Sequence, residues 1–398
     1  MFQANRRRLM AELPGSLFAL SAYTMMQRGN DAAATFEQEA NFWWLTGIEA
    51  ADWWVIIDGT RDKSWLVAPR LSESHQIFDG SLSPEAAIAT SGVDEVISED
   101  EALSMVRDLA KKHSIIHTLG EQPYAEYLDF HLNPAPKKMH ESLKRTFNSV
   151  QDCRKELATL RAIKQPEEIT AIKKAIRLTT DAFEEVRKKL PILSHEYEVE
   201  AEFTYHFRKN GAKGHAYDPI VAVGGNACTL HYVDNADKLK KRQLLLMDIG
   251  ARADGYAADI TRTYALGEPT RRQAAVHTAV QFAQEEIIAL ISPNLSVEQY
   301  QKEVDAIMTT ALLKLNLMKD ANDKENYRKY FPHAISHGLG VDVHDSLGAP
   351  KFLQPGMVLT VEPGIYIPEE GIGVRIEDDI LVTDKGFTNL SARLSTDL

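Results

Sequence analysis

The chain has 398 residues, of which 44% are hydrophobic and 26% are charged, as in ordinary globular proteins. Its net charge of −12 argues against general binding of nucleic acids, because phosphate backbones are held by concentrated lysine and arginine. The two cysteines, Cys153 and Cys228, exclude a disulfide framework, an all-cysteine zinc site and a cysteine-ligated iron–sulfur cluster.

The N-terminal region predicts neither secretion nor membrane insertion. Three arginines at residues 6–8 resemble the basic start of a signal peptide, but Glu12 and Pro14 interrupt the apolar stretch that follows. No run in the sequence approaches the roughly 18 apolar residues of a membrane span. Two lone cysteines suit a reducing compartment. We therefore expect a cytoplasmic protein that does not act at a membrane, and the length predicts two domains.

Strand and helix alternate in the first part of the chain. Asp58-Gly59 is a turn signal between two short apolar segments, which indicates a pair of strands. Such alternation is typical of an α/β layer domain, which we place at residues 1–155. The predicted elements are strands at 53–57, 64–67 and 115–119 and a helix at 101–112.

Residues 156–398 indicate a second domain, of the α+β class. Pro166 is followed by two acids and predicts a helix start, since proline is preset for the first turn and acids favour that end of the helix dipole. Asn210-Gly211 predicts a helix end, and Ser296 predicts another start. The predicted helical segments are 153–189, 196–209, 270–290 and 296–315, and the predicted strands include 244–249, 259–264, 358–362 and 374–382.

Two aspartates lie at facing ends of predicted neighbouring strands. Asp248 ends one apolar strand and Asp259 begins the next, with an intervening turn that contains Gly255. In an antiparallel hairpin this odd separation predicts direct cross-strand neighbours, about 5 Å apart on one face. Two ionised carboxylates at that distance repel each other unless a cation lies between them. The pair alone fits either a metal site or two aspartates that cap turns.

Two glutamates occupy similar settings near the C-terminus. By two-residue alternation Thr360 and Glu362 share one side of a strand, and Arg375 and Glu377 share one side of another. An acid among valine, leucine and isoleucine is costly to bury without a partner. Each alone fits a charge on an edge strand, but four such acids in one half of the chain favour a shared site.

Three histidines lie close together in a glycine-containing stretch. His333, His337 and His344 are separated by four and seven residues, and the glycines between the last two predict irregular backbone rather than helix. These histidines can therefore converge on one pocket. His231, which follows a glycine-rich turn, is a fourth candidate.

Five strings, in this order and spacing, resemble the pita-bread metallopeptidases, specifically the group of Xaa-Pro aminopeptidase (aminopeptidase P) and prolidase. They are residues 248–250, 255–263, 336–345, 360–366 and 375–379. Residues 36–47 resemble the N-terminal domain of the same group. The resemblance implies an α+β pita-bread catalytic domain at residues 156–398, preceded by a smaller α/β creatinase-type domain at residues 1–155.

The resemblance also implies a two-metal centre. Its five ligands would be Asp248, Asp259, His337, Glu362 and Glu377, with Asp259 and Glu377 bridging the ions. Four carboxylates balance the charge of two divalent cations. A donor set of oxygens with one imidazole favours Mn²⁺, with Zn²⁺, Co²⁺ and Fe²⁺ as alternatives.

The reaction that the resemblance implies is hydrolysis of the peptide bond before proline, by attack of a hydroxide that bridges the two metals. His231 and His344 would stabilise the oxyanion, and Glu362 would carry a proton from the nucleophile to the leaving nitrogen. His333 and Arg375 would line the proline side of the cleft. The expected substrates are peptides with proline in the second position.

Two other functions stay open on the sequence. An Xaa-Pro dipeptidase (prolidase) needs a cation for the C-terminal carboxylate of the substrate, and Arg375 can serve either enzyme. A non-catalytic pita-bread binding module is the third reading, but such members usually lose ligands, and all five positions match here. The family commonly forms homodimers or homotetramers, so we expect one of these.

Overall fold

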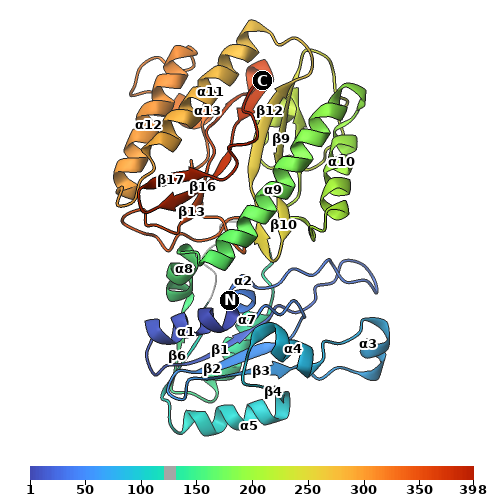
Figure 1. The fold of residues 1–398 in the computed structure, drawn as a ribbon, viewed down its shortest axis with the longest axis vertical. Coiled ribbons are helices and arrows are strands. Elements are labelled where there is room, and N and C mark those ends of the chain that lie inside the picture. The colour runs from blue at the N-terminus through green and yellow to red at the C-terminus, as the bar shows by residue number, and fades with distance from the viewer. Residues whose placement is uncertain (121–130) are drawn as a thin grey trace. The chain divides into compact units, whose positions relative to one another are not determined.

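The computed structural model describes residues 1–120 and 131–398, which form two compact units, Met1–Leu160 and Arg161–Leu398 (Figure 1). The predicted domain boundary at 155/156 falls within helix α8 (Arg154–Ala162), which spans the division between the units. Among the described residues, no helix combines the length and apolar character that crossing a membrane requires.

The described part of the first unit is built on a six-stranded mixed sheet. Its elements are α1 (Phe2–Glu12), β1 (Leu17–Ser21), α2 (Ala40–Thr46), β2 (Trp54–Asp58), β3 (Lys63–Ala68), α3 (Glu73–Phe78), α4 (Pro84–Ser91), β4 (Glu95–Ser98), α5 (Glu99–Ala110), β5 (Ile115–Thr118), α7 (Ala135–Lys144), β6 (Ser149–Asp152) and α8. The strand order is β4-β3-β2-β1-β5-β6, in which β2 runs antiparallel to its neighbours β1 and β3 and all other neighbouring strands pair in parallel. Leu109 of α5 and Leu143 of α7 share a core with Ile56 of the sheet, so the predicted α/β alternation is confirmed.

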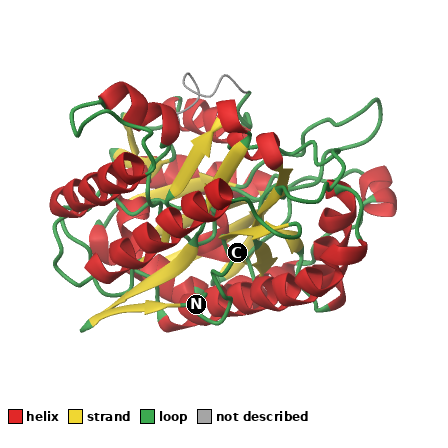
Figure 2. Ribbon diagram, turned by 90° about the horizontal axis from the view of Figure 1, so that it is seen from above, coloured by secondary structure: helices red, strands yellow, loops and turns green. Residues whose placement is uncertain are grey.

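The second unit places strands between two groups of helices, which Figure 1 shows in green and in orange. Its helices are α9 (Pro166–Lys189), α10 (Glu196–Lys209), α11 (Arg271–Leu290), α12 (Val297–Lys314) and α13 (Lys324–Tyr330), with 3₁₀ turns η1 (Leu190–Ile192), η2 (Gly224–Cys228) and η3 (Pro368–Glu370). Its strands are β7 (Gly214–His215), β8 (Ile220–Val223), β9 (Leu244–Ile249), β10 (Ala251–Ala253), β11 (Tyr256–Ala257), β12 (Ile260–Ala265), β13 (Val358–Val361), β14 (Gly364–Ile367), β15 (Ile372–Arg375), β16 (Asp378–Thr383) and β17 (Gly386–Asn389). Figure 2 marks helices in red and strands in yellow.

The helices of this unit begin where the sequence places caps. Pro166 opens α9, and the side chain of Ser296 accepts a hydrogen bond from the backbone N–H of Gln299 at the start of α12. Helices α9 and α10 pack on β7, β8, β10 and β11, and α11 packs on β13, β14 and β15. The main core joins α11 and α12 to these strands, with Val280, Met308 and Ile365 among its buried residues.

A long hairpin carries the two aspartates, in a register that differs from the predicted one. β9 and β12 form its base, β10 and β11 form its tip, and Asp254 and Gly255 make the turn with positive φ. This turn lies one residue later than direct pairing of the aspartates requires, so Thr261 rather than Asp259 lies opposite Asp248. The prediction of direct cross-strand neighbours is therefore wrong. Asp259 is a diagonal neighbour, and diagonal residues still share one face of the hairpin.

The predicted strand 374–382 is two strands in two sheets. β15 pairs with β14 and β16 pairs with β13, and Glu377 lies in the break between them. The backbone N–H of Glu377 donates to the carbonyl of Thr261 at 3.1 Å, which directs the chain from one sheet into the other. Glu362 likewise lies just beyond the end of β13.

Candidate metal centre

Four acids of the second unit lie close together, at points where strands begin, end or are interrupted. Asp248 lies near the end of β9, Asp259 directly before β12, Glu362 directly after β13, and Glu377 between β15 and β16. His337 lies on the irregular segment 333–345, as the glycines predict. Asp248, Asp259 and Glu377 are buried, with 7%, 5% and 2% of their surface exposed.

The ligand atoms of these residues form overlapping groups, each within 4.8 Å. One group is Asp248, Asp259 and Glu377, and a second is His337, Glu362 and Glu377. Asp259 and His337 also form a group with His344. Glu377 belongs to the first two groups, so one carboxylate lies within reach of two adjacent ion positions. All five residues that the sequence proposes as metal ligands are thus in one cluster.

Mutual repulsion and burial disfavour the charged form of this cluster. Burial and the charge of Asp248 raise the pKa of Asp259, and burial and the charge of Asp259 raise that of Glu377 well above its ordinary value. Burial also raises the pKa of Glu362 to about 7. His337 responds in the opposite sense: burial lowers its pKa, but the hydrogen bond and charge of Asp259 outweigh this and raise it to about 9.

Tyr217 lies between the two aspartates and is not among the residues that the sequence predicts for the site. Its hydroxyl oxygen is 2.6 Å from Oδ1 of Asp248 and 2.6 Å from Oδ1 of Asp259. One hydroxyl has one proton to donate, so the second short contact needs a proton on a carboxyl group or a nearby cation. No motif marks Tyr217, because it precedes β8 in an irregular segment and reaches the site only through folding.

Arg375 is a buried cation within this cluster, and its guanidinium already forms hydrogen bonds. It donates to Oδ2 of Asp248 at 2.5 Å, to the hydroxyl of Tyr366 at 2.8 Å and to that of Thr261 at 3.1 Å. Only 5% of the residue is exposed. Thr261 in turn donates to Oε2 of Glu377 at 2.7 Å, so Arg375 orients two of the acids.

The remaining histidines surround the acids. Nε2 of His333 lies 2.9 Å from the Tyr366 hydroxyl, and the rings of His337 and His344 are 4.3 Å apart. Partial desolvation, with the nearby charges of His337 and His231, lowers the pKa of His344 to about 4. His231 is exposed on the segment after η2, and its charge also acts on His333.

The side chains fit a pair of divalent cations. Burial and mutual repulsion raise the pKa values of Asp259, Glu362 and Glu377, and cations would stabilise these groups as anions. The donors of the cluster are mostly oxygens, with one imidazole from His337. Nδ1 of His337 lies 2.9 Å from the carbonyl of Gly338, a contact that fixes the ring and leaves Nε2 toward the acids.

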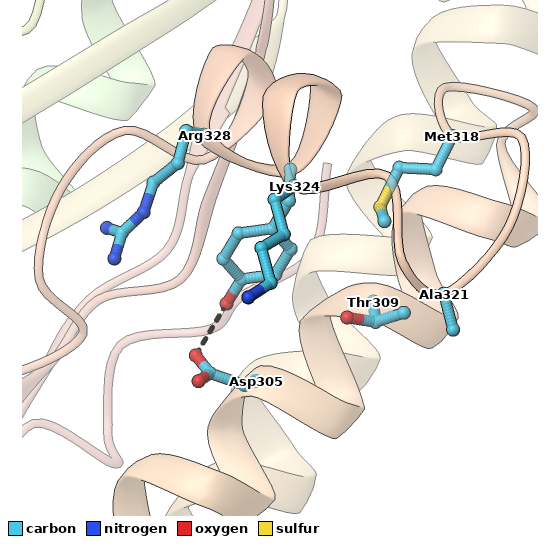
Figure 3. Close-up of a pocket in the computed structure, with 7 residues that line it drawn as sticks. Asp305, Thr309, Met318, Ala321, Lys324 and Arg328 are labelled. Carbon is cyan, nitrogen blue, oxygen red and sulfur yellow. Dashed lines mark hydrogen bonds between the residues drawn. The ribbon is translucent and has the colours of Figure 1, made fainter.

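A separate cavity of about 290 Å³ lies between α12 and α13 (Figure 3). Asp305, Lys324 and Arg328 are among its lining residues, and Asp305 accepts a hydrogen bond of 2.8 Å from Tyr327. Its described lining provides one carboxylate and no histidine. It therefore lacks the ligand set that the acid cluster has.

Comparison with known proteins assigns the family. The model of metallopeptidase family M24 matches residues 170–384, and the model of the aminopeptidase P N-terminal domain matches residues 2–117. The chain belongs to metallopeptidase family M24. It is therefore a peptidase, and the family implies divalent metal ions. This confirms the predicted pita-bread fold with a creatinase-type N-terminal domain.

Relatives of this M24 member are Xaa-Pro aminopeptidases along nearly its full length. The Xaa-Pro aminopeptidase of Escherichia coli is 32% identical over 98% of this chain and 94% of the relative, and Xaa-Pro aminopeptidase 3 of Homo sapiens is 34% identical over 91% and 75%. The solved structure of proline aminopeptidase P II from Yersinia pestis has a TM-score of 0.85 and 32% identity, and covers 100% of this chain and 96% of its own. These findings support the aminopeptidase P prediction over the prolidase alternative.

Proposed function

We propose that this M24 peptidase releases the N-terminal residue from peptides whose second residue is proline. The observation that carries the proposal is the pair of overlapping ligand groups that share Glu377, in a chain whose relatives are Xaa-Pro aminopeptidases. The buried position of Arg375 also favours an aminopeptidase. A guanidinium that already binds Asp248 and Tyr366 is poorly placed to grip the free carboxylate of a dipeptide.

Two Mn²⁺ ions are the proposed cofactors. Asp248, Asp259 and Glu377 would hold one ion, and His337, Glu362 and Glu377 the other, with Asp259 also bridging. When bound, the pair supplies a Lewis acid for the scissile carbonyl and lowers the pKa of a shared water so that it attacks as hydroxide. The choice of Mn²⁺ rests on the oxygen-rich donor set, and Zn²⁺, Co²⁺ and Fe²⁺ are the competitors.

The chain's own residues then bind and orient the reactants. Glu362 carries a proton from the nucleophile to the leaving nitrogen. His231 and His344 donate to the oxyanion, where one well-placed donor contributes about 3–4 kcal/mol. His333 lines the proline side together with Arg375, which acts through Tyr366. Because the nitrogen of a proline residue carries no hydrogen to donate, the proline side of the cleft recognises the shape of the ring.

A substrate panel tests the proposal. The protein reconstituted with Mn²⁺, and in parallel with Zn²⁺, Co²⁺ or Fe²⁺, is assayed on Xaa-Pro-Yaa tripeptides, the same tripeptides with a blocked N-terminus, Xaa-Ala-Yaa controls and Xaa-Pro dipeptides. We expect cleavage of the free Xaa-Pro-Yaa peptides and little cleavage of the blocked or alanine peptides. Cleavage restricted to dipeptides would support prolidase, and no cleavage with any of the four metals would support a binding module.

The setting of the enzyme is also proposed. We infer a cytoplasmic homodimer or homotetramer that binds neither nucleic acid nor membrane. Both cysteines are free thiols, which suits a reducing compartment, and the net charge of −12 disfavours polyanions. Light scattering on the purified chain checks the oligomer, and cell fractionation checks the compartment.

A further inference from the structure

Glu196, the first residue of α10, is a fully buried acid outside the metal centre. None of its surface is exposed, and among the described residues no lysine, arginine or histidine forms an ion pair with it. A buried carboxylate without a cation is costly unless several donors compensate it. The hydrogen-bond donors around Glu196 therefore indicate the role of this buried carboxylate.

Four donors converge on the two oxygens of this carboxylate. Oε1 accepts from the backbone N–H of Val223 at 2.7 Å and from Nδ2 of Asn226 at 3.1 Å. Oε2 accepts from the hydroxyl of Tyr232 at 2.9 Å and from the backbone N–H of Asp237 at 2.8 Å. All four donors belong to one segment, residues 223–237, which leaves β8 and returns toward β9.

This segment has little regular structure to fix its shape. After the 3₁₀ turn η2 it contains no helix or strand up to Asp237. The start of α10 also pairs with its far end, because the backbone N–H of Glu196 donates to the carbonyl of Asp237 at 3.0 Å. Glu196 thus binds the beginning, the middle and the end of the segment at a single point.

His231 lies in the middle of this segment, next to Tyr232. Its side chain is exposed, so packing of the imidazole itself does not fix its position. Tyr232 is half-buried and its hydroxyl is held by Glu196. The position of the His231 side chain therefore depends on the anchored backbone around it.

We propose that Glu196 is a positioning residue for peptide hydrolysis, which holds the 223–237 segment so that the imidazole of His231 faces the metal centre. The inference rests on the proposed function, in which His231 stabilises the oxyanion. This role explains why a buried acid is present at this position without a cationic partner among the described residues. Only a carboxylate offers acceptors to all four donors at once. In Glu196→Gln the amide NH₂ would face two of the donors and leave them unpaired.

A double-mutant cycle on kcat tests this inference. Glu196→Gln, His231→Ala and the double variant are assayed with Mn²⁺ on an Xaa-Pro-Yaa tripeptide. We expect Glu196→Gln to lower kcat by roughly ten- to a hundredfold with KM changed less than about threefold, as small misplacements of catalytic groups do. In the His231→Ala background it should lower kcat no further, because Glu196 acts through His231. Independent, multiplicative losses of kcat would overturn the inference, as would a wild-type kcat in Glu196→Gln.

Two further variants separate positioning from general loss of stability. Tyr232→Phe removes a single donor and leaves the start of α10 intact, so it provides the same cycle if Glu196→Gln does not fold. Glu39→Gln is the matched control: Glu39 is a buried carboxylate of the first unit that accepts from the backbone N–H of Phe42 and from Asn41. We expect Glu39→Gln to lower the Tm while its kcat stays within about twofold of wild type.

The results of these assays distinguish the proposed function from the inference about Glu196. If the wild-type protein cleaves no Xaa-Pro peptide with any of the four metals, the proposed function fails, and the role of Glu196 fails with it. If the wild-type protein cleaves these peptides but the cycle is additive, the proposed function stands and only the inference about Glu196 is wrong.

Discussion

The hydroxyl of Tyr217 bridges the two buried carboxylates of the hairpin. It contacts Asp248 and Asp259, each at 2.6 Å, while Arg375 holds the other oxygen of Asp248. Residues that orient metal ligands typically change metal affinity by about 10–100-fold when they are lost. Tyr217 therefore belongs to the function of the site although it is not among the proposed ligands.

We predict that Tyr217→Phe weakens binding of Mn²⁺ by about 10–100-fold with little change in the Tm of the metal-free protein. Isothermal titration with Mn²⁺ measures the affinity. Tyr264→Phe is the matched control, because Tyr264 is buried but its hydroxyl has no hydrogen-bond partner among the described residues. Equal affinities for the wild type and Tyr217→Phe would show that the hydroxyl does not orient the ligands.

His277 of α11 makes stability depend on pH away from the metal centre. Burial lowers its pKa from 6.5 to about 4, and 3% of the residue is exposed. The unfolded chain thus binds a proton below pH 6.5 that the folded chain does not bind until about pH 4. The free energy of unfolding falls as the pH drops through this window, by up to about 3 kcal/mol from this group.

We predict that His277→Leu removes this part of the acid sensitivity. Denaturant unfolding of the metal-free wild type and of the variant at several pH values between 4 and 7 gives the two slopes. The wild type should lose about 3 kcal/mol more than the variant across this range. Parallel curves would contradict the assignment of the slope to His277.

The helices and strands show which structural features the sequence pattern predicts and which it does not. Helices α11 and α12 lie within a residue or so of their predicted ends, because capping at Thr270 and Ser296 is local chemistry. The predicted register of the hairpin differs from the observed one by one turn position, because several two-residue turns fit the sequence between Asp248 and Asp259. Likewise the hydrophobic pattern of 374–382 does not reveal the break at Glu377, which depends on Thr261, a residue far away in the chain.

The candidate site was more predictable than these details. The five proposed ligands follow from motifs that are recognised by their order and spacing in the sequence, so an error in the predicted strand register does not affect them. Tyr217 and Glu196 could not be found in this way, because their contacts span at least 31 residues and at least 27 residues of the chain, respectively, and no short motif encodes them. Their residue types are ordinary, and only their partners make them informative.

The hairpin depends on close backbone approach at Gly250. A Cβ there would lie 1.8 Å from the carbonyl oxygen of Ala258, directly before Asp259. We predict that Gly250→Ala forces these backbones apart, lowers the free energy of unfolding by about 3 kcal/mol or more, and abolishes metal binding. Thermal unfolding and Mn²⁺ titration measure both effects. Gly29→Ala is the control, because a Cβ at Gly29 meets no atom within 4 Å; a Gly250→Ala variant as stable as this control would contradict the argument.

At the scale of the whole molecule, bound cations should decide much of the stability of the second unit. Burial and mutual repulsion raise the pKa values of Asp259, Glu362 and Glu377, so the charged form of these acids destabilises the metal-free fold. In the folded state these groups bind protons that the unfolded chain releases, so the metal-free protein gains stability from them as the pH falls from about 7, the pKa of Glu362, toward the unfolded value of 4.5.

We predict that chelation lowers the Tm at pH 7.5 and that Mn²⁺ restores it, because ions that bind only the folded state stabilise it. The gap in Tm between the metal-loaded and metal-free protein should shrink at pH 5, where protons replace part of the missing positive charge. Calorimetry at both pH values measures the gap. A gap that widens at pH 5 would be inconsistent with repulsion among these acids.

The proposed function requires that five side chains from distant parts of the chain bind two cations. Equilibrium dialysis of the metal-free protein against Mn²⁺, with metal analysis of the bound fraction, counts the ions directly. We predict two Mn²⁺ per chain for the wild type and at most one for Glu377→Ala, which should also lose peptide hydrolysis. A wild-type chain that binds no Mn²⁺, or a Glu377→Ala variant that binds two and cleaves Xaa-Pro peptides normally, would contradict the account.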